Sequence, residues 1–68
     1  MYRSYNEVYQ VGPNRVSLYF QDGELESVKI KSGSAPAKYF EVWEEIREAW
    51  LQQARIWAAK GIHPQILT

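Results

Sequence analysis

The sequence predicts a small α+β domain in which a three-stranded antiparallel β-meander is followed by one long C-terminal α-helix packed on one sheet face (βββα). Two observations predict it. Apolar and polar residues alternate through the first half of the chain, with breaks at glycine-containing turns. Trp43, Trp50 and Trp57 then recur at an interval of seven, which lines one side of a helix with a drift of ~20° per step. We expect a single domain over residues 1–68.

Two strands joined by a turn are expected at the start of the chain. They span residues 5–11 and 15–21, where apolar and polar residues alternate. Pro13 suits the second position of a type I turn between them, since proline fixes φ near the value that this position needs. With a two-residue turn that begins at Pro13, Val8 lies opposite Tyr19 and both side chains point away from the helix. Val8 and Tyr19 are therefore candidate partner-binding residues.

The third strand is expected over residues 24–31, after a tight turn at Asp22 and Gly23. Its three apolar residues would not all lie on one face of a regular strand, because side chains alternate between the two faces. A simple two-residue turn places Leu25 on the inner face and Val28 and Ile30 on the outer face. A three-residue loop with a bulged glycine places Val28 and Ile30 on the inner face and Leu25 on the outer face. A β-bulge near Glu26 brings all three inside, and we favour it. The three apolar residues are Leu25, Val28 and Ile30.

The helix is expected over residues 36–60, with Ser34 as its capping residue and a proline in its first turn. Gly61 is a good C-terminal stop, and Ile62 is expected to fold back on the last helical turn. Residues 61–68 then form a short tail.

The predicted helix is longer than the predicted sheet. It extends ~37 Å at ~1.5 Å per residue, against ~23 Å for a strand at ~3.3 Å per residue. We expect Trp43 and Trp50 in the core, and Leu51, Ile56 and Trp57 on the uncovered length as candidate partner-binding residues. A chain of 68 residues has a small core and needs further stabilisation. We therefore expect two chains to form a homodimer in which antiparallel helices cover each other's exposed apolar residues.

Charge is balanced, with eight basic and eight acidic residues and a formal net charge of zero. This balance argues against a general nucleic-acid role, which normally needs a basic excess. Four glutamates form a candidate acidic patch on the outer face of the expected helix, although a solvated face that suits the helix dipole is the favoured explanation. They are Glu41, Glu44, Glu45 and Glu48.

Residues with catalytic or metal-binding chemistry are sparse. Cysteine is absent and His63 is the sole histidine, so neither a thiolate site nor an ordinary zinc site can be assembled. No phosphate-binding loop or nucleophile elbow is present. We expect no enzyme activity, no catalytic residues, no metal and no cofactor.

No apolar run approaches the ~20 residues of a membrane span, and the first residues lack the apolar stretch of a signal peptide. We therefore expect a cytoplasmic protein with no membrane association.

The expected function is that of a small non-catalytic protein-binding module, as a homodimer, that serves as an accessory factor or inhibitor of a larger protein. The partner is another protein or a second copy of the chain. A subunit that completes another chain's active site is a further interpretation. The main alternative is a nucleic-acid-binding protein that uses the aromatic and basic face of the sheet. Its residues would be Tyr5, Tyr9 and Tyr19 with Arg3, Arg15, Lys29 and Lys31.

Overall fold

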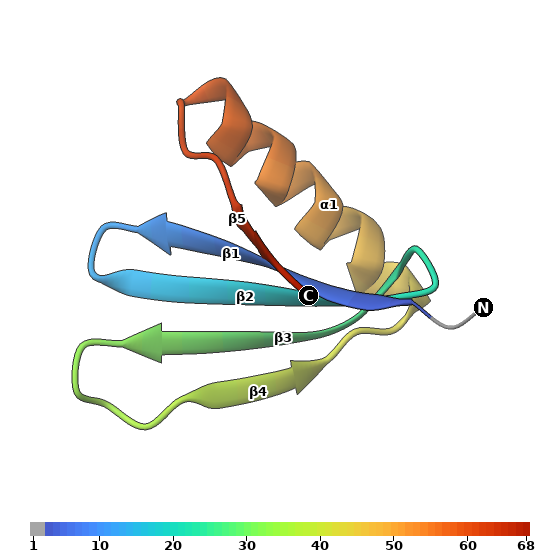
Figure 1. Cartoon of the computed structure of the whole chain (residues 1–68), viewed down its shortest axis with the longest axis horizontal. Helices are drawn as coiled ribbons and strands as arrows, with labels where there is room; N and C mark the ends of the chain where they lie inside the picture. The colour runs from blue at the N-terminus through green and yellow to red at the C-terminus, as the bar shows by residue number, and fades with distance from the viewer. Residues whose placement is uncertain (1–2) are drawn as a thin grey trace.

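A computed structural model describes residues 3–68 (Figure 1). In these residues one antiparallel sheet has the strand order β4-β3-β2-β1-β5, and helix α1 lies across one of its faces. The first four strands form a meander, after which α1 returns the chain to the opposite edge of the sheet. The elements are β1 (Ser4–Val11), β2 (Asn14–Gln21), β3 (Glu24–Ser32), β4 (Lys38–Glu41), α1 (Glu44–Ala59) and β5 (Gln65–Leu67).

The α+β class holds, but the predicted three-stranded βββα arrangement is wrong. The described residues form five strands, and α1 has 16 residues rather than the 25 of the range 36–60. Lys38–Glu41 extends along β3, and Gln65–Leu67 pairs with β1. Tyr39 and Phe40 are strand formers. The free edge of β3 supplies the hydrogen-bonding partners that make an extended conformation preferable there.

The first hairpin turns one residue earlier than predicted. Val11 pairs with Asn14, so Gly12 and Pro13 form the two-residue loop. Gly12 has φ 60°, as the first central residue of a type II′ turn requires. The predicted type I turn is therefore wrong, because a glycine at positive φ matches the twist of the flanking strands.

That shift changes the partner of Val8. Val8 pairs with Ser17, and Tyr19 pairs with Asn6, so the predicted pairing of Val8 with Tyr19 is wrong. The predicted face is nevertheless right. Tyr9 contacts Trp57 of the helix, and side chains alternate along a strand, so Val8 points to the helix-free face.

The second hairpin confirms the predicted β-bulge. Asp22 and Gly23 both have positive φ, at 51° and 82°, which is the requirement of a type I′ turn. Phe20 pairs with Leu25 and Tyr19 with Ser27, so one extra residue is left between them on β3. The extra residue shifts the alternation of side chains, so that the apolar residues before and after the bulge face the same side of the sheet. Leu25 and Val28 are consequently buried in the core, and Ile30 packs against it.

The core lies between the helix and the inner face of the sheet. Tyr5 stacks on Phe20 with ring centroids 5.0 Å apart, and Tyr9 meets Trp57 with centroids 4.9 Å apart. Aromatic side chains bury a large apolar area each, which helps a chain of this size. The buried cluster comprises Tyr9, Val16, Leu18, Phe20, Leu25, Val28, Val42 and Trp57.

The helix ends as predicted but begins elsewhere. Gly61 has φ 84°, the Ile62 amide donates to the Trp57 carbonyl at 2.9 Å, and the Gly61 amide donates to that of Ala58 at 3.0 Å. These two bonds make a Schellman motif, with Ile62 packed against the core. The predicted cap at Ser34 is wrong, because Ser34 lies in the β3–β4 loop and Trp43 is the N-cap residue.

The predicted overhang of the helix is also wrong. A helix of 16 residues spans about 24 Å, close to the ~26 Å of an eight-residue strand. Trp57 is consequently 9% exposed against its own sheet. The predicted dimer through paired helices depended on this overhang, so the structure does not support it.

Candidate protein-binding surface

An apolar groove runs between strand β4 and the first half of α1. It has a volume of about 430 Å³, and we call it the β4–α1 groove. Trp43 is 57% exposed there and Phe40 is 44% exposed, while Ile46 and Trp50 are partly buried. The lining residues are Tyr39, Phe40, Glu41, Trp43, Ile46 and Trp50.

The groove continues in both directions. A second hollow of about 320 Å³ shares Phe40 and extends along the helix side of β3 and β4, where Ile30 adds apolar surface. A third, of about 270 Å³, shares Ile46 and Trp50 and extends along the helix. Adjacent exposed apolar side chains of this kind are a common feature of interaction sites.

The chain folds this way because Val42 anchors the junction between β4 and α1. Val42 is buried in the core, and its amide donates to the Glu26 carbonyl at 3.0 Å. The helix begins two residues later, and the Arg47 Nε donates to the Leu25 carbonyl at 3.1 Å, which holds the first turns of α1 beside the start of β3. Trp43 lies between these two anchors and projects outward.

The predicted partner-binding residues did not include the groove residues Phe40 and Ile46, and Trp43 was predicted in the core. The misplacement follows from reading residues 36–43 as helix. A signal was available, since Tyr39, Phe40, Val42 and Trp43 are all strand formers and the helix formers become continuous only after Glu44.

The five residues predicted to bind a partner are not brought together. Trp57 is in the core, and Leu51 packs against it. Ile56 is 48% exposed on the outer side of α1. Val8 is buried and Tyr19 half-buried on the opposite face of the sheet.

The predicted acidic patch is divided. Glu44, Glu45 and Glu48 are exposed on α1, whereas Glu41 is on β4, opposite Ser27 and on the helix-free face. Glu48 Oε1 lies 3.7 Å from Arg55 Nη1. Both side chains are exposed, so this ion pair contributes little to stability. Glu44 and Glu45 occupy the first turn of the helix, where carboxylates complement the helix dipole.

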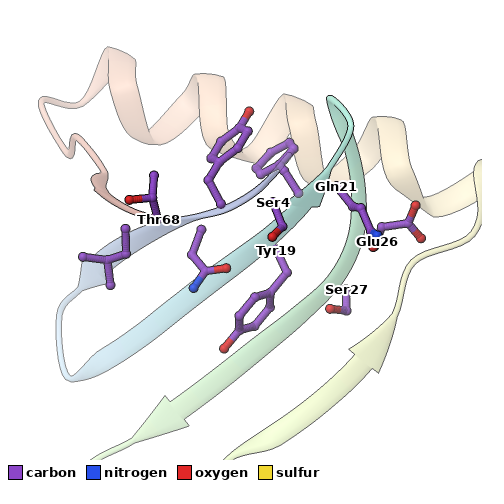
Figure 2. Close-up of a pocket in the computed structure, with 10 residues that line it drawn as sticks. Ser4, Tyr19, Gln21, Glu26, Ser27 and Thr68 are labelled. Atoms are coloured by element: carbon purple, nitrogen blue, oxygen red, sulfur yellow. The ribbon is translucent and has the colours of Figure 1, made fainter. Parts of the chain in front are cut away.

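A fourth, more polar hollow of about 310 Å³ lies by the start of β1, the end of β2, the start of β3 and the C-terminus. Figure 2 shows Tyr19 and Ser27 pointing away from the helix, with Gln21 and Glu26 beside one another at the bulge. Its lining carries hydroxyl, amide and carboxylate groups beside the side chains of Tyr5, Phe20 and Leu67. It therefore offers more hydrogen-bonding groups than the β4–α1 groove does.

The residues suggested for nucleic-acid binding are divided between the two faces of the sheet. Tyr5 and Tyr9 point into the core, which leaves Tyr19 as the one of the three on the helix-free face. The Lys31 Nζ donates to the carbonyls of Gly33 and Ala35, at 3.2 and 2.6 Å, and so ties down the β3–β4 loop. Arg15, Lys29 and Lys31 lie on the helix-free face with Tyr19, because Arg15 pairs with Lys31 and Ser17 with Lys29. This face therefore keeps three of the predicted basic residues but one of the three predicted tyrosines.

The pKa of the Tyr9 hydroxyl is raised above its ordinary value. This hydroxyl donates to Glu7 Oε1 at 3.2 Å. Burial, followed by the charge of Glu7 and this hydrogen bond, raises the pKa of Tyr9 to about 12. The neutral phenol is the form that the core accommodates, so this shift reflects packing.

Within residues 3–68, His, Asp and Glu side chains do not gather in groups of three that could hold a metal ion. Over the same range no helix combines the length and apolar character needed to traverse a membrane. No protein-family model, no curated protein and no solved structure matches the sequence.

Proposed function

We propose that this protein is a small non-catalytic protein-binding module whose binding surface, the β4–α1 groove, takes another protein or a second copy of the chain, and that the module serves as an accessory factor or inhibitor of a larger protein. The observation that carries the proposal is the exposure of Trp43, at 57%, beside Phe40, at 44%. Tryptophan is among the residue types that dominate binding energy at protein interfaces, where the ring fills a pocket of the partner.

The position of Trp43 adds support. Trp43 is the N-cap residue of α1, and its side chain makes no capping hydrogen bond. Serine, threonine, aspartate and asparagine are preferred there because they accept a bond from a free helix amide. A residue that neither caps the helix nor enters the core has little value for folding. Partner binding accounts for an exposed indole at this place.

The nucleic-acid alternative has weaker support, because two of its three tyrosines belong to the core. A cytoplasmic location, expected from the sequence, is part of the proposal, and fractionation of the native cells tests it.

Site-specific photo-crosslinking tests the binding surface. A benzophenone amino acid replaces Trp43 in one variant and Arg15, on the helix-free face, in a matched control, and both are expressed in the native cells. We expect protein adducts from position 43 and not from position 15. Purified adduct partners should then bind the wild-type chain and bind Trp43→Ala at least ten times more weakly. Adducts from position 15 alone, or with nucleic acid alone, would refute the proposal.

A further inference from the structure

Strand β4 is an edge strand, and the direction of its free backbone groups can be deduced. The Val42 amide donates to the Glu26 carbonyl, in register with the pairing of Phe40 with Val28. Hydrogen-bonded pairs alternate along an antiparallel ladder, so Phe40 also bonds toward β3. The amides and carbonyls of Tyr39 and Glu41 therefore point to the free edge, where they can receive another strand.

From this geometry we propose that the groove is occupied by a second copy of this chain, joined β4 to β4 about a two-fold axis at Phe40 into one continuous sheet. The proposal rests on the proposed function, since it names the partner of the same groove. Two-fold pairing brings one surface against its own copy, the commonest arrangement of homodimers.

The direction of the free groups restricts the register. Residues that exchange bonds across the new edge must be Tyr39 and Glu41 on both strands. Tyr39 can therefore pair with Glu41 of the second copy, or either residue can pair with its own equivalent. The first choice uses both outward residues of β4 and exchanges bonds in both directions. A register centred on Tyr39 uses only that outward residue and places Phe40 opposite Lys38 of the second copy. A register centred on Glu41 brings two carboxylates opposite each other, which is unfavourable. We therefore assign the first, in which Phe40 meets its own equivalent.

Apolar surface then meets apolar surface. Phe40 is on the helix side of the sheet, because its partner Val28 is in the core. At the axis the two Phe40 residues form a non-hydrogen-bonded pair, whose side chains approach most closely, with Cα atoms ~4.5 Å apart. Trp43 follows on the same side of each chain, so the two grooves join and the second copy covers each exposed indole.

Charge is complementary in this register. Lys38 is on the helix side, opposite Ile30, and would lie opposite Val42 of the second copy, beside the carboxylates of Glu44 and Glu45 that follow it. On the other side, Tyr39 would lie against Glu41 of the second copy. The Lys29 Nζ is 5.8 Å from the centroid of the Tyr39 ring, so a cation is already near this carboxylate position.

The other edge of the sheet is a poorer template. Strand β5 has three residues, and only Ile66 directs its backbone groups outward, because its two neighbours bond to β1. The β4 edge has two outward residues and an apolar groove beside it.

Engineered cysteines test the register, since the chain has no cysteine of its own. Phe40→Cys should form an intermolecular disulfide under mild oxidation, because the expected Cα separation of ~4.5 Å is within the range for a disulfide. Tyr39→Cys is the matched control. Its equivalent atoms would be about 8–9 Å apart, which is too far to bridge. A disulfide from Tyr39→Cys but not from Phe40→Cys overturns the register.

Charged substitutions test the axis independently. Phe40→Glu and Phe40→Lys should each sediment as monomers at 50 µM, whereas an equimolar mixture should sediment at twice the 8.0 kDa chain mass. Since Phe40 is 44% exposed, both variants should keep the wild-type circular dichroism spectrum. If the register is centred on Tyr39, Phe40→Glu faces Lys38 and remains a dimer, which overturns the assignment.

Sedimentation of the wild-type chain separates this inference from the proposed function. A dimer at 50 µM that dissociates in Phe40→Glu supports the inference. A wild-type monomer at 50 µM overturns it, yet the proposed function stands if position 43 still crosslinks to a different protein. If the wild type is monomeric and position 43 gives no protein adduct, both are refuted.

Discussion

The two ends of helix α1 differ although their tryptophans belong to one heptad pattern. Trp57 is 9% exposed and packs on Tyr9, at an end closed by a Schellman motif. Trp43 is 57% exposed at an end whose N-cap side chain makes no capping bond. Periodicity places residues on one face of a helix, but the extent of the helix and of the sheet beneath it decides which of them are buried.

The largest expected effect is at the buried end. Trp57→Ala should lower the free energy of unfolding by ~3–5 kcal/mol, because it opens a cavity beneath the helix. That loss is enough to unfold a domain of this size. Urea denaturation followed by circular dichroism measures it, with Trp43→Ala as the matched control. Equal losses in the two variants would contradict the contrast between the two ends.

The contact between Tyr9 and Trp57 should also give a pH dependence. Folding raises the pKa of Tyr9 from 10.0 to about 12, so the stability it contributes is fully present below pH 10 and is lost as pH rises to 12. The loss is about 2–3 kcal/mol by that difference in pKa. Urea titrations at pH 9, 10, 11 and 12 measure it.

Tyr9→Phe should flatten this part of the pH profile, whereas Tyr39→Phe, which alters a side chain 70% exposed, should not. An unchanged profile in Tyr9→Phe would mean that other groups cause the alkaline loss of stability.

A smaller effect is expected where the helix stops. Gly61→Ala should cost about 1–2 kcal/mol, since a β-carbon is unfavourable at the φ of 84° that the Schellman motif requires. Open space surrounds this glycine, so the loss reflects backbone strain rather than a clash. Thermal unfolding measures it. Gly61→Asn should retain more stability than Gly61→Ala, because asparagine tolerates positive φ.

The smallest effect is expected at the open end, and it has the opposite sign. Trp43→Ser should raise the free energy of unfolding by about 0.5–1 kcal/mol, because serine can cap the helix. The measurement is made in the Phe40→Glu background, so that self-association does not contribute. Trp43→Ala supplies the reference without a cap. A loss of stability in Trp43→Ser would show that the indole supports the fold.

The sequence by itself determined the three long strands, the bulge and the end of the helix. Each depends on local chemistry. The Asp22-Gly23 turn needs positive φ, the parity of Leu25 and Val28 needs one extra residue, and Gly61 supplies the left-handed stop.

Only the tertiary structure decided strands β4 and β5 and, with them, the candidate binding surface. Both are short and mostly exposed, so neither has the buried alternation by which a strand is recognised. They are extended because β3 and β1 present unpaired hydrogen-bonding groups at matching register, a condition set by residues distant in the chain. Once Lys38–Glu41 pairs with β3, α1 begins at Glu44, and Trp43 is left at the open end of the groove.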